Sequence, residues 1–512
     1  MPRGTGTSRL QGRHCFGGDL VPRRCPGLYA TRRSGGRGER STYISGPHPR
    51  DFACLTFAGV ASILRRYALF GEGAKQSVDT KTCYVGLVGF GTVGAGVAKI
   101  LLNDAAKLRA KTGIQIVLKR ICDIDLTSDR GVRVPDGVLT NDLDSILTDA
   151  SIEVVIELVG GTTVAKEITL RALAAGKRVV TANKALLAEH GRELFRAARE
   201  RGVSISFEAS VGGGIPIIAA LRDGLIANDI ESIIGIVNGT CNYILTRMSL
   251  AGATYEQALA EAQSHGYAEK DPRLDVEGID SAHKLAILAA LGFAADFHYH
   301  EIHVEGITRL EPIDIAYAAE FGYALKLLAI GKRVNGELEL RVHPTLLPVE
   351  HPLAAVHDVF NGIFVRGNAV GDTMFYGRGA GQMPTASAIV SDIVDILLGK
   401  AKHTFERLRL FPGRTGSLRV RSIEESESRY YLRFAAVDRP GVLAKIAGEF
   451  GRHDISIASL LQKERHATQA VPLIIMTHQA REANLRRALA AIEPQGIVEG
   501  NPVVLRVEGE HG

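Results

Sequence analysis

Apolar and polar positions divide the chain into regions with different predicted elements. From about residue 81, short apolar runs alternate with segments whose apolar residues recur at helical spacing. The short runs span 83–88, 115–122, 154–158 and 178–181, and the helical spacing covers 92–108 and 165–175. Strands that alternate with amphipathic helices predict an α/β domain, in which helices cover both faces of a parallel sheet.

The pattern becomes mixed after residue 204. Strand-like runs lie at 205–208, 230–237 and 338–346, and helical segments lie at 255–291 and 317–328. This mixture predicts an α+β domain. We expect a helix over 385–398 to return and pack on the first domain, and the polar stretch 424–429 to be a linker.

The last part of the chain predicts a compact β-α-β-β-α-β module. Its six elements are expected at 430–437, 442–453, 455–462, 470–477, 480–492 and 503–508. This order is that of the split βαβ, or ferredoxin-like, unit. The expected organisation is therefore an extension (1–80), a first domain (81–210), a second domain (211–384), a return helix and linker (385–423) and a C-terminal module (430–508).

The net charge of +5 comes from the N-terminal end of the chain. Residues 1–50 contain ten Arg, no Lys and two acidic residues, a net charge of +8, so +5 less +8 leaves −3 for the rest. A mildly acidic body gives no electrostatic case for a nucleic-acid partner. We expect residues 1–80 to be a disordered extension; a transit peptide or a nucleic-acid- or membrane-contacting arm are the alternatives.

Cysteine usage and hydropathy indicate a cytoplasmic protein without a membrane partner. The six cysteines are Cys15, Cys25, Cys54, Cys83, Cys122 and Cys241, and none is spaced C-x-x-C. This spacing argues against a disulfide framework or a zinc site and is typical of a reducing compartment. No apolar run reaches 18 residues, so no transmembrane helix is expected.

A glycine-rich turn predicts a nicotinamide dinucleotide cofactor. Gly89, Gly91 and Gly94 form G-x-G-x-x-G directly after a predicted strand and at the start of a predicted helix. Gly89 permits a tight turn, Gly91 lets the backbone approach a pyrophosphate, and Gly94 permits close packing of helix on strand. The first domain is therefore expected to be of the Rossmann type and to bind NAD(P)H.

An acidic residue after the second predicted strand bears on the choice of cofactor. Asp123 lies where a carboxylate would bind the ribose 2′-hydroxyl of NAD and repel a 2′-phosphate. Two alternatives stay open. Asp123 merely caps a loop, or Arg120 and Arg130 nearby favour NADP.

Two lysines and several carboxylates form the candidate catalytic set. Lys184 follows the strand predicted at 178–181, where open α/β sheets bind ligands. Asp280 and Lys284 are spaced i, i+4 on one helix face. An ammonium held in this way could protonate a carbonyl oxygen as hydride arrives. A solvated Lys184 and a surface ion pair between Asp280 and Lys284 are the alternatives.

An ordered set of segments resembles the homoserine dehydrogenase family. The segments are VTANKALLA, FEASVGGGIP, IVNGTCNYIL, GYAEKDP, the D-x4-D-x3-K run that ends at Lys284, and GRGAGQMPTASA. They span most of residues 83–400. The resemblance implies reversible, NAD(P)-dependent reduction of L-aspartate 4-semialdehyde to L-homoserine, in threonine, methionine and isoleucine biosynthesis. It also implies a homodimer or homotetramer.

The resemblance assigns roles by position. It implies that Lys284 is the proton donor and Lys184 the second active-site lysine, and that Glu269, Asp275 and Asp280 bind substrate or orient the lysine. The implied cofactor contacts are Phe90, Thr92, Val93 and Gly381. The implied site for a monovalent cation, sodium, is built largely from main-chain carbonyls of Glu208, Val211, Gly213 and Ile215.

The chain departs from the family pattern at two positions. Relatives that prefer NADP tend to carry Arg around the position of Asp123, and Leu274 stands where some relatives have an acidic residue. Leu274 cannot bind substrate by charge. Cys241 offers a competing interpretation as a thiol nucleophile, but nothing around it indicates an activated thiolate, so a structural cysteine is expected.

The turn from Asp438 to Leu443 resembles that of ACT domains, which bind free amino acids. Here the implied effector is L-threonine; a pure dimerisation module is the alternative. For the whole chain, two other functions remain as alternatives. One is a dehydrogenase for another semialdehyde or amino acid, and the other is a sensor that kept the fold and lost the chemistry.

Overall fold

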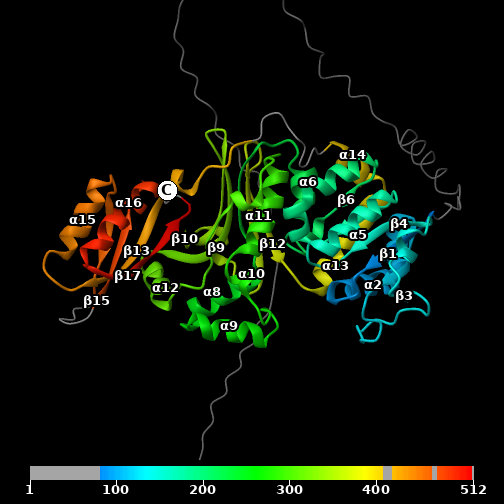
Figure 1. Ribbon diagram of the computed structural model, residues 1–512, viewed down its shortest axis with the longest axis horizontal. Coiled ribbons are helices and arrows are strands. Elements are labelled where there is room, and N and C mark those ends of the chain that lie inside the picture. Colours follow the sequence, from blue (N-terminus) through cyan, green and yellow to red (C-terminus); the bar gives the residue numbers. More distant parts are fainter. Residues whose placement is uncertain (1–80, 408–417, 464–469, 510–512) are drawn as a thin grey trace, which may run out of the picture. The chain divides into compact units, whose positions relative to one another are not determined.

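The computed structural model describes residues 81–407, 418–463 and 470–509 (Figure 1). The expectations for residues 1–80 lie outside the described residues.

The first domain contains the predicted parallel sheet. Its strands in the described part of the chain are β1 (Lys81–Val88), β2 (Ile114–Cys122), β3 (Leu139–Thr140), β4 (Ile152–Glu157), β5 (Arg178–Thr181) and β6 (Ile205–Ser206). They are ordered β3-β2-β1-β4-β5-β6, and every neighbouring pair is parallel. The chain changes direction across the sheet between β1 and β4. The carboxyl ends of these two strands are therefore where a ligand is expected.

Helices cover this sheet, but not all as predicted. They are α2 (Thr92–Asn103), α3 (Ala105–Thr112), α4 (Asp144–Leu147), α5 (Thr163–Ala174) and α6 (Lys184–Glu200). The single helix predicted over 92–108 is wrong, because the chain leaves helical geometry at Asp104. The reason is burial: α2 buries an apolar face, whereas α3 buries no residue. Packing against the core therefore stabilises α2. It does not hold α3 in line with α2, so the two segments do not form one continuous helix.

The predicted return helix is confirmed as α13 (Gln382–Leu397). Its residues Ile389 and Ile393 share a buried cluster with Val97 and Leu101 of α2. The helix α14 (Lys400–Arg407) follows it. The chain thus returns to the first domain after building the second.

The second domain is a mostly antiparallel sheet with helices. Its strands are β7 (Ile230–Ile236), β8 (His303–Val304), β9 (Tyr323–Val334), β10 (Glu337–Pro348), β11 (Phe360–Gly367) and β12 (Gly371–Arg378). Its helices are α7 (Ile217–Ala219), α8 (Gly239–Ala251), α9 (Tyr255–Ser264), α10 (Arg273–Val276), α11 (Ile279–Gly292) and α12 (Pro312–Glu320). The main strands are ordered β12-β11-β7-β9-β10.

The helix predicted over 317–328 is wrong. The helix α12 ends at Glu320, Gly322 adopts a φ of +79°, and β9 begins at Tyr323. A continuous apolar run does not by itself distinguish a strand from a buried helix. The partner decides here, since β9 pairs with β10 along its whole length.

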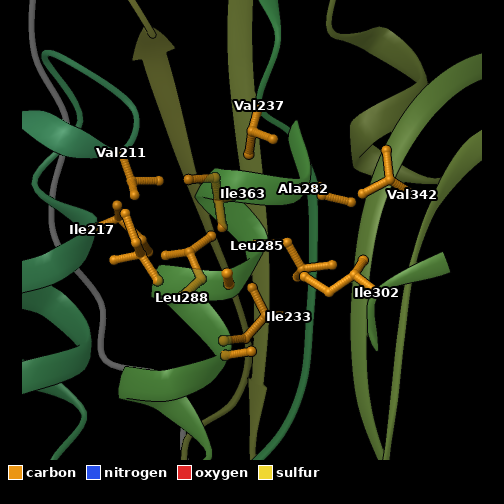
Figure 2. Close-up of a cluster of buried hydrophobic side chains, with 14 of the residues drawn as sticks. Val211, Ile217, Ile233, Val237, Ala282, Leu285, Leu288, Ile302, Val342 and Ile363 are labelled. Carbon is orange, nitrogen blue, oxygen red and sulfur yellow. The ribbon is translucent and has the colours of Figure 1, made fainter. Parts of the chain in front are cut away.

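The helix α11 lies in the middle of a hydrophobic core. Figure 2 shows Leu285 and Leu288 of α11 among Ile233 of β7, Ile363 of β11 and Val237, which directly follows β7. Nearly every residue of α11 is buried. Polar side chains on this helix are therefore withdrawn from water as well.

The C-terminal module has the predicted βαββαβ order, with a two-residue strand, β16, where the helix predicted over 480–492 was expected to begin. Its elements are β13 (Glu427–Val437), α15 (Val442–Arg452), β14 (Ile457–Leu461), β15 (Ala470–Thr477), β16 (Ala480–Arg481), α16 (Glu482–Ile492) and β17 (Val498–Val507). The linker predicted over 424–429 is wrong in part, because β13 begins at Glu427. The strand β17 pairs in parallel with β10, so one sheet runs through the second domain and the module (Figure 1).

Candidate active site

The three glycines of the turn after β1 differ in what surrounds them. A Cβ atom on Gly89, whose φ is +98°, would lie 2.6 Å from the main chain of Leu158, and one on Gly94 would lie 2.1 Å from the carbonyl oxygen of Gly89. A Cβ atom on Gly91 would have nothing within 4 Å. Gly89 and Gly94 are thus needed by the turn itself. Gly91, at the N-cap of α2, keeps an open approach that fits a pyrophosphate.

Asp123 caps the glycine-rich turn. Its carboxylate accepts hydrogen bonds from the main-chain N–H of Phe90 and, at 2.9 Å, of Asp125. Arg130 is paired with Asp125 at 2.8 Å, and Arg120 donates to the carbonyl of Lys119. Asp123 therefore does cap a loop, as one of the alternatives held. A carboxylate has further lone pairs, so a second role toward the ribose stays a prediction.

The start of α13 brings Gly381 close to the glycine-rich turn. Gly381 precedes α13 with a φ of +119°, and the next residue, Gln382, donates to the carbonyl of Thr92 at 3.0 Å. Gly381 and Thr92 are exposed and Val93 is half-buried, whereas the side chain of Phe90 is buried. Phe90 can therefore contact a cofactor only through its main chain.

Lys184 is the first residue of α6, beyond the end of β5. The preceding Asn183 caps α6 by accepting from Leu186 N at 3.1 Å, and its amide donates to the carbonyl of Gly161 at 2.7 Å. These bonds fix the direction in which α6 leaves the sheet. Lys184 Nζ lies 3.1 Å from Asp280 Oδ1, with a side chain that is 40% exposed.

Asp280 binds both candidate lysines. Its Oδ2 lies 2.7 Å from Lys284 Nζ, which also donates to the carbonyl of Val237 at 2.6 Å. The side chains of Asp280 and Lys284 are only 8% and 10% exposed. The alternative of a surface ion pair is therefore wrong, and the cluster joins Lys184 of the first domain to α11 of the second.

The charges of this cluster reinforce one another. Burial alone would raise the pKa of Asp280, but the charges of Lys284 and Lys184 hold it well below its ordinary value. The Asp280 charge in turn raises the pKa of Lys184. Burial and the Asp280 charge raise the pKa of Asp275. One carboxylate thus stays ionised between two ammonium groups.

Asn238 connects the carboxylates, and sequence reasoning assigned it no role. Its amide nitrogen donates to Asp275 Oδ1 at 2.7 Å and to Asp280 Oδ2 at 2.9 Å, while its oxygen accepts from Cys241 N at 2.8 Å and so caps α8. The available signal was an asparagine between a predicted strand and a helix. Such a residue is typical of an N-cap.

The loop that carries Glu269 borders the cluster from outside. Thr240 donates to the carbonyl of Tyr267 at 2.6 Å, which ties this loop to the start of α8. Glu269 is exposed, and its charge contributes to the raised pKa of Lys184 after those of Asp280 and Asp275. Four predicted residues, Lys184, Asp275, Asp280 and Lys284, are thus in one bonded network, with Glu269 at its edge.

Cys241 lies beside this network as a buried thiol. Its Sγ donates to the carbonyl of Asp275 at 3.1 Å. Burial, together with the charges of Asp275 and Asp280, raises the pKa of Cys241 well above its ordinary value. The protonated form is poorly nucleophilic, so the geometry favours a structural cysteine.

The loop after β6 contains the residues implied for a cation. The Glu208 carboxylate is occupied, because it accepts from Ile218 N at 2.9 Å and Ala219 N at 2.8 Å. A Cβ atom on Gly213 would lie 2.6 Å from the carbonyl oxygen of Gly379, so the two loops touch. The implied ligands are therefore main-chain carbonyls, of which that of Ile215 also accepts from Ile217 N. Within the described ranges, no group of three or more His, Cys, Asp or Glu side chains could hold a metal ion.

The fold and this site together define an NAD(P)-dependent oxidoreductase with a C-terminal ACT domain. The family model described as "Homoserine dehydrogenase, NAD binding domain" matches residues 89–208, and "Homoserine dehydrogenase" matches 216–394. The model "ACT domain" matches residues 430–495.

Known proteins are similar in sequence to most of the chain. A homoserine dehydrogenase of Pseudomonas aeruginosa is 43% identical over 440 residues, 84% of this chain and 99% of the relative. One of Neisseria gonorrhoeae is 41% identical and is covered completely, again over 84% of this chain. A crystal structure of a homoserine dehydrogenase from Thiobacillus denitrificans has a TM-score of 0.78 and 42% identity, over 84% of this chain and 98% of that chain. The chain belongs to the homoserine dehydrogenase family.

A more distant structure bears on the cofactor. A hyperthermophilic archaeal homoserine dehydrogenase, whose structure is in complex with NADPH, is 27% identical with a TM-score of 0.52, over 62% of this chain and 98% of that chain.

Among the described residues, no helix is both long enough and apolar enough to cross a membrane.

Proposed function

We propose that this chain interconverts L-aspartate 4-semialdehyde and L-homoserine with NAD(P)H, a step toward threonine, methionine and isoleucine. The observation that carries the proposal is Asp280 held between Lys184 and Lys284. Lys184 extends from the carboxyl end of β5, and the glycine-rich turn follows β1 in the same parallel sheet. The carboxyl ends of parallel strands lie at one edge, where open sheets bind ligands.

Lys284 is the residue that we assign to proton transfer. Its ammonium has three donors, of which one goes to Asp280 and one to the carbonyl of Val237. The third can reach a carbonyl oxygen and give it a proton during reduction. In the reverse direction the amine receives the proton of the hydroxyl. Asp280 keeps the ammonium oriented.

The other polar groups position the substrate. Lys184 is the more exposed lysine and can polarise the same oxygen from the side of the first domain. Asp275 and Glu269 offer carboxylates to the ammonium of the amino-acid substrate. Asn238 donates to both Asp275 and Asp280. It thereby lies between the two carboxylates and keeps them from direct contact.

The cofactor is assigned to the glycine-rich turn, with Gly91 facing the pyrophosphate and Thr92, Val93 and Gly381 beside it. When bound, it supplies the hydride or takes it up. Asp123 favours NAD, and the pairing of Arg130 with Asp125 leaves that arginine less available to a 2′-phosphate.

Three further assignments follow from the family. We assign a sodium ion to the main-chain carbonyls of Glu208, Val211, Gly213 and Ile215; oxygen ligands suit a hard cation, although the Ile215 carbonyl also accepts from Ile217 N at 2.8 Å. We assign L-threonine as the effector of the ACT domain. A homodimer or homotetramer in the cytoplasm completes the proposal, and the free thiols of Cys83, Cys122 and Cys241 suit that compartment.

Initial rates test the proposal. Purified protein is assayed with L-homoserine and either NAD or NADP, with and without L-threonine and with sodium or potassium salts. Turnover supports the reaction, a preference for NAD supports the role of Asp123, and inhibition by threonine supports a sensing ACT domain. Absence of turnover with either cofactor, in protein that binds NAD(P)H, would refute the substrate and favour a sensor or another dehydrogenase.

A further inference from the structure

A buried arginine of the C-terminal module binds carboxylates on both sides of the module boundary. Arg506 lies in β17, and its side chain is 4% exposed. Its guanidinium donates to Glu482 of α16 at 2.7 and 2.9 Å, within the module. It also donates to Glu305 of the second domain at 2.9 and 3.0 Å. Arg506 thus makes two hydrogen bonds to each carboxylate. Bidentate bonding of this kind fixes the orientation of both carboxylates relative to the guanidinium.

Glu305 belongs to a segment that packs on the residues before α11. Glu305 N donates to the carbonyl of Val342 in β10, and Ile307 N donates to the carbonyl of Val276, both at 2.8 Å. A Cβ atom on Gly306 would lie 2.3 Å from the oxygen of Val276. The main chain at Glu305 therefore cannot shift without moving the end of α10.

Three residues of the candidate catalytic set, Asp275, Asp280 and Lys284, lie on α10 and α11. Gly278, the N-cap of α11, has a φ of +85°, and a Cβ atom there would lie 3.3 Å from the carbonyl oxygen of Glu305. Asp275 lies three residues before Gly278, and Asp280 two residues after it. The contact between Glu305 and Gly278 thus lies at the point where both carboxylates are positioned.

We propose that Arg506 and Glu305 are positioning residues, through which the C-terminal module sets the start of α11 and thereby the placement of Asp275, Asp280 and Lys284. The path runs from Arg506 to Glu305, then through main-chain contacts to Val276 and Gly278. This proposal deepens the proposed function, on which its kinetic consequences rest. A ligand that moves β17 in the module would change substrate binding by this path without entering the active site.

A second carboxylate of the same kind provides a matched control. Glu311, just before α12, accepts from Arg433 of β13 at 2.9 Å. Both carboxylates belong to the second domain, and both accept from an arginine of the module; their side chains are 37% (Glu305) and 59% (Glu311) exposed. Glu305 adjoins the segment that leads to α11, whereas Glu311 precedes α12. The variants Glu305→Gln and Glu311→Gln therefore make the same chemical change in a carboxylate that accepts from the module, although Arg433 also keeps two hydrogen bonds to Asp314.

The kinetic experiment compares these two variants in the full chain. We expect Glu305→Gln to raise the KM for L-homoserine about fivefold with the KM for the cofactor unchanged, since altered coupling is on the order of a few-fold to tenfold. Glu311→Gln is expected to change neither. Glu305→Asp, which restores a charge, should recover part of the loss. Equal changes in both variants would mean that the arginines only dock the module, and no change in either would also refute the proposal.

Amide hydrogen exchange tests the same path without turnover. Peptides that cover residues 273–284 should exchange faster in Glu305→Gln than in the parent protein, and at the parent rate in Glu311→Gln. If the parent protein fails to oxidise homoserine, the proposed function fails while this measurement still decides the inference. Unchanged exchange in Glu305→Gln would overturn it.

Discussion

Two buried charge clusters in this protein are built in opposite ways. At the active site one carboxylate, Asp280, serves two ammonium groups, and Lys284 uses only two of its three donors within the chain. At the module boundary one guanidinium, Arg506, serves two carboxylates through all three of its nitrogens. The first cluster keeps a donor available for a ligand. The second uses four of the five N–H donors of its guanidinium within the chain and holds two parts of the chain in place.

The pKa of the carboxylate is lowered at both clusters, but the cations that lower it differ. Burial alone would raise the pKa of Glu305, but the hydrogen bond from His303 and the charge of Arg506 hold it well below its ordinary value. Asp280 is held low in the same way by lysines. Lysine presents a point charge with rotatable donors, whereas the arginine fork fits carboxylates in a fixed geometry. The comparison therefore predicts loss of chemistry at one cluster and loss of stability at the other.

Removal of Lys284 should have the largest effect. We expect Lys284→Ala to lower kcat for homoserine oxidation by about 10³, because general acid–base catalysis contributes roughly 10²–10⁴. The affinity for NAD(P)H, followed by fluorescence titration, should not change. Lys400→Ala, which removes an exposed lysine paired with Asp223 and Asp395, is the control and should retain full turnover. Unchanged kcat in Lys284→Ala would remove the proton-transfer assignment.

Removal of Arg506 should act on stability. We expect Arg506→Met to lower the free energy of unfolding by about 3 kcal/mol, since it leaves Glu482 buried without its main partner. Chemical denaturation measures this change. Arg486 also contacts Glu482, at 3.2 Å, but is 45% exposed. Arg486→Met should therefore cost less than about 1 kcal/mol, and equal losses in the two variants would contradict the distinction.

A negative charge placed between the two active-site carboxylates should lower kcat/KM, with a smaller change in free energy than in the two variants above. Asn238→Asp keeps the oxygen that caps α8 but loses the donor to Asp275 and Asp280. We expect kcat/KM for homoserine to fall about tenfold, which corresponds to about 1.4 kcal/mol. Asn228→Asp makes the same change at a cap formed with Ala369 and Val370 and should leave kcat/KM within about twofold. A fall of equal size in both variants would argue against a role of Asn238 in the cluster.

A buried carboxyl bonded to the main chain should give the smallest effect. Asp392 accepts from Glu208 N at 2.8 Å, and burial together with the Glu208 charge raises its pKa to about 8. Its contribution to stability is fully present below the unfolded pKa, about 4, and is lost as the pH rises toward 8. Between pH 6 and 7, the parent protein should lose about 1 kcal/mol more than Asp392→Asn. Parallel denaturation curves over this range would refute the shift.

The glycine-rich turn and the ACT order were predictable because each depends on local geometry. The positions of Gly89, Gly91 and Gly94 follow from a turn that must approach its own backbone. The βαββαβ order follows from periods of two and 3.6 residues. The first part of β9 is predicted as a helix, because its apolar run is buried and pairing with β10 and β7 determines its conformation.

The candidate site was predictable in its residues but not in its bonds. Lys184, Asp275, Asp280 and Lys284 were identified from spacing and resemblance, whereas Asn238 was not, since its role depends on two carboxylates 37 and 42 residues further along. The link from Arg506 to Glu305 spans 201 residues and leaves no local pattern. This contact depends on the pairing of β17 with β10, which brings the two residues together.

The sequence by itself determined the elements whose hydrophobic period and turn chemistry are local, together with the kinds of groups available for catalysis. Tertiary structure decided which charges are buried, because burial depends on what packs against α11 from the sheet. It also decided that β17 joins β10, which brings Arg506 to Glu305. Electrostatic energies depend on distance and burial, and the order of residues along a chain specifies neither.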